Sequence, residues 1–275
     1  MAEIKQSANK RKPVRSKLPA NSVRDFRNLL DKALSATDDH GRKWVDARWG
    51  CYAFYDYDGE PIYVGQTNEK LRTRIRRHLT NQRTDAVAMR ILDVFEVADM
   101  EVWPLWEYEG LTKKEDPQGY ELARARLDAV EYTAYLQAIK TSRFRAILNE
   151  KIPPLSDVTD LPLSERFPLI SKETREERGH PDVRIARRAE TISRLAAVAH
   201  ERGEVSDGLR RVLVIQAVRL AYISAARLAY VEGRAEPSAS AIDVQGLVGT
   251  VLFEPSDPQG RKDKDETESE EGRDG

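Results

Sequence analysis

Two short runs of aromatic and β-branched residues, separated by a turn, constrain this chain more than any other feature. The runs span residues 50–55 and 61–65, and Asp58 and Gly59 lie between them. A glycine at such a turn tolerates positive φ, and the flanking runs suit pleated strands. Pro61 opens the second run, where its missing N–H does least harm. The sequence therefore predicts a β-hairpin here.

A basic segment follows the hairpin, and residues 68–79 have the pattern of a short helix. Its apolar residues recur every four positions and so share one face: Leu71, Ile75 and Leu79. Asn68 can cap this helix. Arg74 and His78 are also four residues apart and lie one turn from each other on a second face. Arg72 is expected on the opposite flank, because each residue advances the helix by about 100°.

Composition limits the functional classes. The net charge of the 275-residue chain is −1, so a nucleic-acid surface has to be a local patch. One cysteine, Cys51, excludes an intramolecular disulfide and a cysteine-based zinc cage. We find no Gly-rich phosphate loop and no Gly-x-Ser-x-Gly motif. With no apolar run of membrane-spanning length and no apolar signal core, we expect a cytoplasmic protein without membrane contact.

The N-terminal half is predicted to hold a sheet. Residues 1–20 are basic and predict a disordered arm that either contacts phosphates or is only solvated. Residues 21–48 predict a helix and a linker, and residues 49–155 form the expected main domain. After the hairpin and its helix, this domain shows a helical, a strand and a second helical pattern: 86–94, 100–108 and 119–140. Pro104 places the third strand on a sheet edge or requires a bulge.

The C-terminal half is predicted to be helical. Residues 156–182 form a linker with one short helical piece, and residues 183–253 form a helical domain containing an antiparallel helical hairpin. Residues 254–275 are acidic and predict a disordered tail. These helices could bind DNA, dimerise or contact another protein, and the oligomeric state stays open. The expected fold is α/β (α+β), with a small mixed three-stranded sheet flanked by helices and followed by an α-helical domain.

Two triplets in the hairpin carry a family resemblance: Gly50-Cys51-Tyr52 and Tyr63-Val64-Gly65. They resemble the signature of the GIY-YIG nuclease superfamily, with Cys51 and Val64 replacing isoleucine. Both replacements are apolar and leave the chemistry untouched. The resemblance covers residues 50–154 and implies a metal-dependent DNA endonuclease, of restriction, mobile-element or repair type. The alternative is a non-catalytic DNA-binding module that retains the fold.

The resemblance also implies roles for the polar residues of the hairpin and its helix. Tyr52 corresponds to the general base, and a phenol with a pKa of ~10 needs nearby cations for that role. Tyr63 is expected to orient water or phosphate. Arg74 offers a planar fork of donors to phosphate oxygens. His78 relays a proton or binds phosphate. Three further arginines are expected to bind nucleic acid: Arg72, Arg76 and Arg77.

The long predicted helix is expected to supply the metal ligand. By the resemblance, a single glutamate holds one divalent ion, Mg²⁺ or another cation such as Mn²⁺. A hard cation accepts one carboxylate together with waters and substrate oxygens. Glu131 is preferred over Glu121 because its sequence neighbours are more core-like. Asn149, near the end of the resemblance, is expected to form hydrogen bonds within the site.

Overall fold

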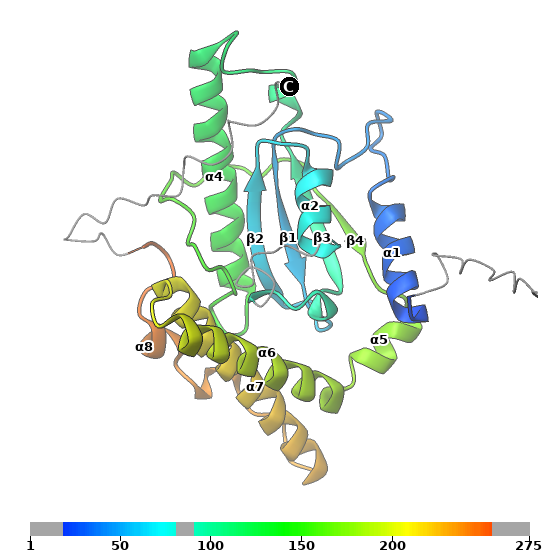
Figure 1. Ribbon diagram of the computed structural model, residues 1–275, viewed down its shortest axis with the longest axis vertical. Coiled ribbons are helices and arrows are strands. Elements are labelled where there is room, and N and C mark those ends of the chain that lie inside the picture. Colours follow the sequence, from blue (N-terminus) through cyan, green and yellow to red (C-terminus); the bar gives the residue numbers. More distant parts are fainter. Residues whose placement is uncertain (1–18, 81–90, 255–275) are drawn as a thin grey trace, which may run out of the picture.

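A computed structural model describes residues 19–80 and 91–254. Most of the predicted basic arm, most of the helix predicted at 86–94 and nearly all of the predicted acidic tail lie outside these residues. The described part combines one four-stranded antiparallel sheet with seven α-helices. Figure 1 shows the sheet upright in the middle, with helices in front of it, behind it and across its lower end.

The strands follow the order β2-β1-β3-β4, and every neighbouring pair is antiparallel. β1 (Gly50–Tyr55) pairs with β2 (Pro61–Thr67) and with β3 (Asp99–Pro104), which in turn pairs with β4 (Glu165–Pro168). The predicted hairpin is therefore present. The predicted α/β fold with a helical C-terminal region is confirmed. The sheet itself differs from the prediction, because it has four strands, not three, and is antiparallel, not mixed. The fourth strand comes from the predicted linker, where only Phe167 of its four residues is buried.

The expectation that Pro104 places its strand on a sheet edge or requires a bulge is wrong, because β3 pairs on both sides without a register shift. β3 lies inside the sheet, and Pro104 is its last residue. Pairing between β3 and β4 has already ended at Val102, so the missing N–H of the proline removes no bond to β4. The chain then continues through a 3₁₀ turn, Trp106–Tyr108, instead of extending the strand to residue 108.

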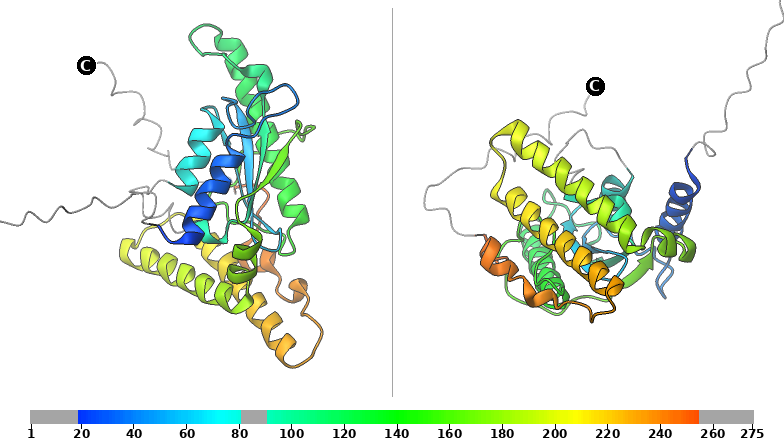
Figure 2. Two further views of the ribbon diagram at one scale, coloured as in Figure 1. Left: turned by 90° about the vertical axis from the view of Figure 1, so that its right-hand side faces the viewer. Right: turned by 90° about the horizontal axis from the view of Figure 1, so that it is seen from below.

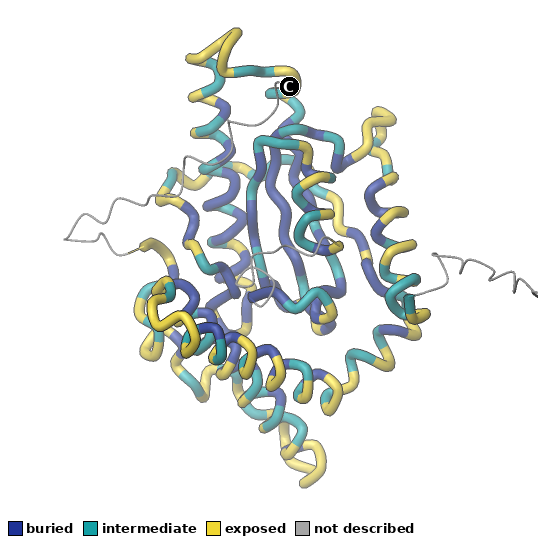
Figure 3. The backbone as a smooth tube through the Cα atoms, in the orientation of Figure 1, coloured by how far each residue is buried: buried dark blue, intermediate teal, exposed yellow. Residues whose placement is uncertain are grey.

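Helices cover both faces of the sheet, as the left view of Figure 2 shows. α1 (Asn21–Ala33) and α2 (Leu71–Leu79) lie on one face, and α4 (Pro117–Thr141) lies on the other. β1 is consequently buried along almost its whole length (Figure 3) and reads as a nearly continuous apolar run. The predicted cap of α2 is wrong: the helix has no side-chain cap, and Asn68 instead donates to the Tyr120 hydroxyl at 2.9 Å.

The C-terminal helices pack against the lower end of the sheet. α6 (Pro181–Arg202) and α7 (Asp207–Val231) form the predicted antiparallel hairpin, preceded by α5 (Lys172–Arg178). The helical domain predicted to run to residue 253 ends in a short helix, α8 (Val244–Val248), which stops before Gly249, a residue with a φ of 74°. Buried residues of α6 and α7 belong to the same hydrophobic core as the sheet.

By length and composition α7 is long and apolar enough to cross a membrane, so the sequence-based statement that no run reaches this length is wrong. The packing gives another reason for its apolar character. Val212, Ile215 and Val218 lie in the common core, and Arg219 on the same helix is only 1% exposed within a network of ion pairs. A core helix passes the same test of length and composition.

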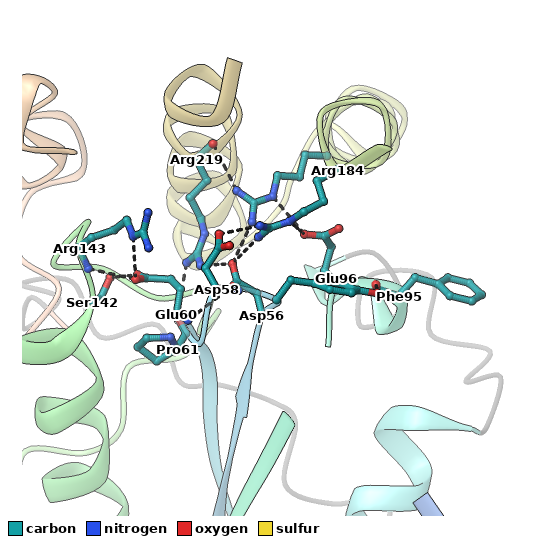
Figure 4. Close-up of polar contacts among 12 residues, drawn as sticks. Asp56, Asp58, Glu60, Pro61, Phe95, Glu96, Ser142, Arg143, Arg184 and Arg219 are labelled. Carbon is teal, nitrogen blue, oxygen red and sulfur yellow. Dashed lines mark hydrogen bonds and ion pairs between the residues drawn. The ribbon is translucent and has the colours of Figure 1, made fainter. Parts of the chain in front are cut away.

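A buried ionic cluster joins the hairpin turn to these helices (Figure 4). Oδ2 of Asp56 accepts from three guanidinium groups at 2.9, 3.0 and 3.5 Å: those of Arg184, Arg188 and Arg219. Its other oxygen accepts backbone N–H groups of the turn. Burial alone would raise the pKa of the Asp56 carboxyl, but the three arginines outweigh it and hold that pKa below its usual range. We call these four side chains the Asp56 cluster.

Candidate active site

The two tyrosines of the hairpin meet His78 beneath α2. Tyr52 is completely buried, and its hydroxyl oxygen lies 2.9 Å from His78 Nε2. The ring of Tyr63 lies 6.1 Å from that of Tyr52 and 5.5 Å from that of His78, measured between centroids. Strand register explains the arrangement, because Tyr52 pairs with Gly65 and Tyr63 therefore lies diagonally across on the same face.

Both motif glycines are required by close contacts. A Cβ at Gly65 would lie 2.7 Å from the Tyr52 hydroxyl oxygen and 2.9 Å from a ring carbon of Tyr63. A Cβ at Gly50 would lie 2.7 Å from the carbonyl oxygen of Trp103 on β3. Both distances are shorter than those that Cβ atoms make in proteins, so a side chain at either position would force its neighbours to move. The first glycine thus lets β1 and β3 approach, and the second leaves room for the tyrosine hydroxyl.

Arg74 lies on the flank of α2 that faces the tyrosines, as the resemblance implies. Its side chain hydrogen-bonds Tyr52 and is close enough to Glu131 to affect that residue electrostatically. The Nε atom is buried and has no hydrogen-bond partner among the residues that the structure describes. Arg74 therefore interacts with both Tyr52 and Glu131, and its Nε–H is a donor left for a ligand.

The ionisation state of Tyr52 differs from expectation. Burial raises the pKa of the Tyr52 phenol well above its usual range, Tyr63 adds to the increase, and Arg74 only partly opposes it. The nearby cation was expected to make Tyr52 a better base, and its effect has the expected sign, but desolvation is larger. Tyr52 is consequently a neutral phenol near neutral pH. Any proton that it accepts has to be matched by one that it gives up, and His78 Nε2 is the neighbour placed to receive it.

Glu131 projects from α4 into the same region. Glu131 is only 8% exposed, whereas Glu121, the alternative candidate for the metal ligand, is exposed to solvent. Burial raises the pKa of the Glu131 carboxyl to about 8, and the Asp128 carboxylate one turn earlier adds to the shift, against Arg74 and Arg124. A cation that replaces the proton of a buried carboxyl stabilises its ionised form, and more so when a second carboxylate lies beside it. Glu131 therefore fits a divalent ion.

The protein can supply only part of a coordination sphere. Among residues 19–80 and 91–254, no group of three or more histidine, cysteine, aspartate and glutamate side chains has the geometry of a metal site. Mg²⁺ usually takes one or two carboxylates from the protein and fills its remaining positions with waters and phosphate oxygens. The Glu131 site matches that pattern.

Asn149 acts on the backbone of the second strand. Its Oδ1 accepts the N–H of Val64 at 3.0 Å, and its Nδ2 donates to the carbonyl oxygen of Val64 at 2.7 Å. The side chain is nearly buried, with 5% exposure. Asn149 thus fixes the backbone of β2 at Val64, the residue between Tyr63 and Gly65. Its effect on the active site is indirect, through the position of this strand.

The three arginines expected to bind nucleic acid each have a carboxylate partner within the protein. The shortest N–O distances are 2.9, 2.9 and 2.7 Å, for the pairs Arg72–Asp46, Arg76–Asp31 and Arg77–Glu69. Arg72 also donates to the carbonyl oxygen of Leu34 and so ties α2 to the segment after α1. A phosphate would have to compete with these partners, and the DNA contacts of the three arginines stay a prediction.

Three polar residues near Glu131 were not singled out from the sequence: Gln66, Arg124 and Asp128. Gln66 directly follows the second triplet, and its Nε2 donates to Asp128 Oδ1 at 2.7 Å. Arg124 and Asp128 precede Glu131 by seven and three residues, so all three share one face of α4. That spacing was readable from the sequence, but its meaning depends on which face of α4 meets β2.

A family model for the GIY-YIG catalytic domain matches residues 48–124. This chain carries a GIY-YIG domain. The match includes both tyrosine triplets and α2, and it ends before Glu131 and Asn149. Searches of curated proteins and of solved structures found no match. The GIY-YIG family is one of nucleases, which supports a hydrolase that acts on DNA at the level of the family, and its members generally depend on divalent metal.

Proposed function

We propose that this protein is a metal-dependent DNA endonuclease that hydrolyses phosphodiester bonds at the GIY-YIG site. The observation that carries the proposal is the convergence of Tyr52, Arg74 and Glu131 from three separate elements. Arg74 hydrogen-bonds Tyr52 and lowers the pKa of Glu131, so a phosphate bound to Arg74 would lie next to the tyrosine and within electrostatic range of the glutamate. A restriction or mobile-element role would use the same chemistry.

Each residue has a distinct task in the proposed reaction. Arg74 presents its guanidinium to non-bridging oxygens of the scissile phosphate, where charge accumulates as water attacks. Tyr52 accepts a proton from the attacking water while passing its own proton to His78 Nε2, which lies 2.9 Å away. Glu131 would hold a divalent cation, Mg²⁺ or Mn²⁺, which supplies positive charge to the phosphate and the leaving oxygen.

The direct test is nicking of supercoiled plasmid DNA by the full-length protein in Mg²⁺, with EDTA as the metal-free comparison. Glu131→Gln should abolish nicking while folding and DNA binding persist, because the carboxylate binds the ion and the phosphate contacts are cationic. Glu121→Gln is the matched control, since it neutralises an exposed glutamate on the same helix and should nick at the wild-type rate. Nicking by Glu131→Gln at that rate would show that Glu131 is not the ligand.

A further inference from the structure

The side chain of Gln66 connects β2 to the acidic face of α4. Its Nε2 donates to Asp128 Oδ1 at 2.7 Å, and the amide forms a second hydrogen bond with Glu131. The bond with Gln66 lowers the pKa of Glu131, which is the effect of a donor on the ionised carboxylate. The amide NH₂ group, which has two hydrogens, therefore donates both bonds. One side chain thus orients two carboxylates one helical turn apart.

The carbonyl oxygen of the same amide, Oε1 of Gln66, is buried and is left without a hydrogen bond among the described residues. Turning the amide over would not relieve this, because it would direct the carbonyl oxygen at two carboxylates and leave the NH₂ group in its place. A buried acceptor without a partner is unfavourable and calls for an explanation. The missing donor has to come from something that enters the site.

A hydrated divalent cation would supply such a donor. Mg²⁺ gives up its waters reluctantly and usually keeps several of them when one or two carboxylates bind it. The O–H groups of those waters point away from the cation and need acceptors around the site. Gln66 Oε1 lies on the amide that also bonds Glu131, so it is near the place where such waters would lie.

We propose that Gln66 is a positioning residue for the divalent cation. Its NH₂ group fixes the carboxylates of Glu131 and Asp128, and its Oε1 accepts a hydrogen bond from a water that the cation carries. The inference rests on the proposed function, since it takes Glu131 as the ligand. Partners of this kind, one layer outside the ligands, change metal affinity by roughly 10–100-fold when they are removed.

The test measures Mn²⁺ binding to the full-length protein without DNA, from the electron paramagnetic resonance signal of free Mn²⁺. Glu131→Gln gives the background of Mn²⁺ held elsewhere on the chain. Gln66→Met keeps the length of the side chain but loses donors and acceptor, and it should raise the Kd by about 10–100-fold. Gln216→Met is the matched control: it removes a buried amide whose Nε2 bonds the Ile91 carbonyl oxygen. That variant should bind Mn²⁺ with the wild-type Kd.

The possible outcomes separate this inference from the proposed function. An unchanged Kd in Gln66→Met, with wild-type binding above the Glu131→Gln background, overturns the inference alone and leaves Gln66 as a tie between β2 and α4. Wild-type binding no greater than that background overturns the metal site and the inference together. A raised Kd in a protein that never nicks plasmid DNA supports the inference and refutes the nuclease. If Gln66→Met does not fold, Gln66→Asn, whose shorter amide cannot span both carboxylates, should show the same rise in Kd.

Discussion

Replacing Asp56 by Asn should strongly destabilise the protein. The side chains of Arg184, Arg188 and Arg219 are 3%, 7% and 1% exposed, and all three converge on one carboxylate oxygen. Asn keeps the shape but removes the charge, so buried guanidinium groups lose a shared counter-ion. Breaking a buried ion pair by removing one partner typically costs about 3–5 kcal/mol. We expect the free energy of unfolding to fall by an amount in that range.

Urea unfolding followed by circular dichroism measures the loss. In a thermal scan, a change of this size should lower Tm by on the order of 10 °C, since each kcal/mol shifts Tm by roughly 2–4 °C in a chain of 150–250 ordered residues. Asp182→Asn is the control. Asp182 pairs with Arg227 at 2.9 Å, but the two side chains are 56% and 29% exposed. Such a pair contributes at most about 1 kcal/mol.

The loss of folding stability at acid pH provides a second test of the Asp56 cluster. The pKa of Asp56 is lower in the folded protein than in the unfolded chain. Its contribution to stability is therefore complete above the unfolded pKa of about 3.9 and is lost as the pH falls through the lower, folded value. Asp56→Asn should lack this part of the acid-induced loss. A loss in urea no larger than that of Asp182→Asn would refute the reasoning, because the cluster would then contribute no more than an exposed pair.

Three further substitutions test the active site. Gly65→Ala should remove most of the nicking activity, because its Cβ would lie 2.7 Å from the hydroxyl oxygen of the β1 tyrosine; wild-type nicking would contradict the assigned contact. In single-turnover cleavage at saturating enzyme, Arg74→Lys should be slower by about 10²–10³-fold, as for loss of one preorganised donor, whereas Arg72→Ala should retain the chemical step. Arg124→Ala should lower the salt dependence of DNA binding by about 0.9 in log–log slope. Arg126→Ala, whose guanidinium instead bonds Thr159 and the carbonyl oxygen of Asp160, should leave that slope unchanged.

Local patterns predicted the parts of the fold that form from local sequence. The hairpin and the apolar face of α2 follow from periodicities within a few residues. β4 does not, because its four residues become a strand only by pairing with β3, more than sixty residues earlier along the chain. The Asp56 cluster could not be predicted from local sequence either, since Asp56 and Arg184 are 128 positions apart. Nothing near either residue marks the other as its partner.

The site was predictable to the extent that the motif carried it. Tyr52, Tyr63, Arg74 and His78 come together as the resemblance and the helix geometry implied. The surroundings of Glu131 were not predictable in the same way, because Gln66 reaches that carboxylate only once α4 packs beside β2. The raised pKa of Tyr52 was missed for a related reason: desolvation depends on how completely the final fold covers the phenol, which no local pattern records.

The position of β2 has a consequence for self-association. A strand at the edge of a sheet offers unpaired N–H and C=O groups to any other chain, and proteins usually cover or interrupt such edges. Here the outer edge is occupied by the segment that ends the domain: the N–H of Leu148 bonds the carbonyl oxygen of Ile62 at 2.8 Å, and Asn149 takes both groups of Val64. The strand that carries Tyr63 can therefore stand at the margin of the sheet without becoming a template for aggregation.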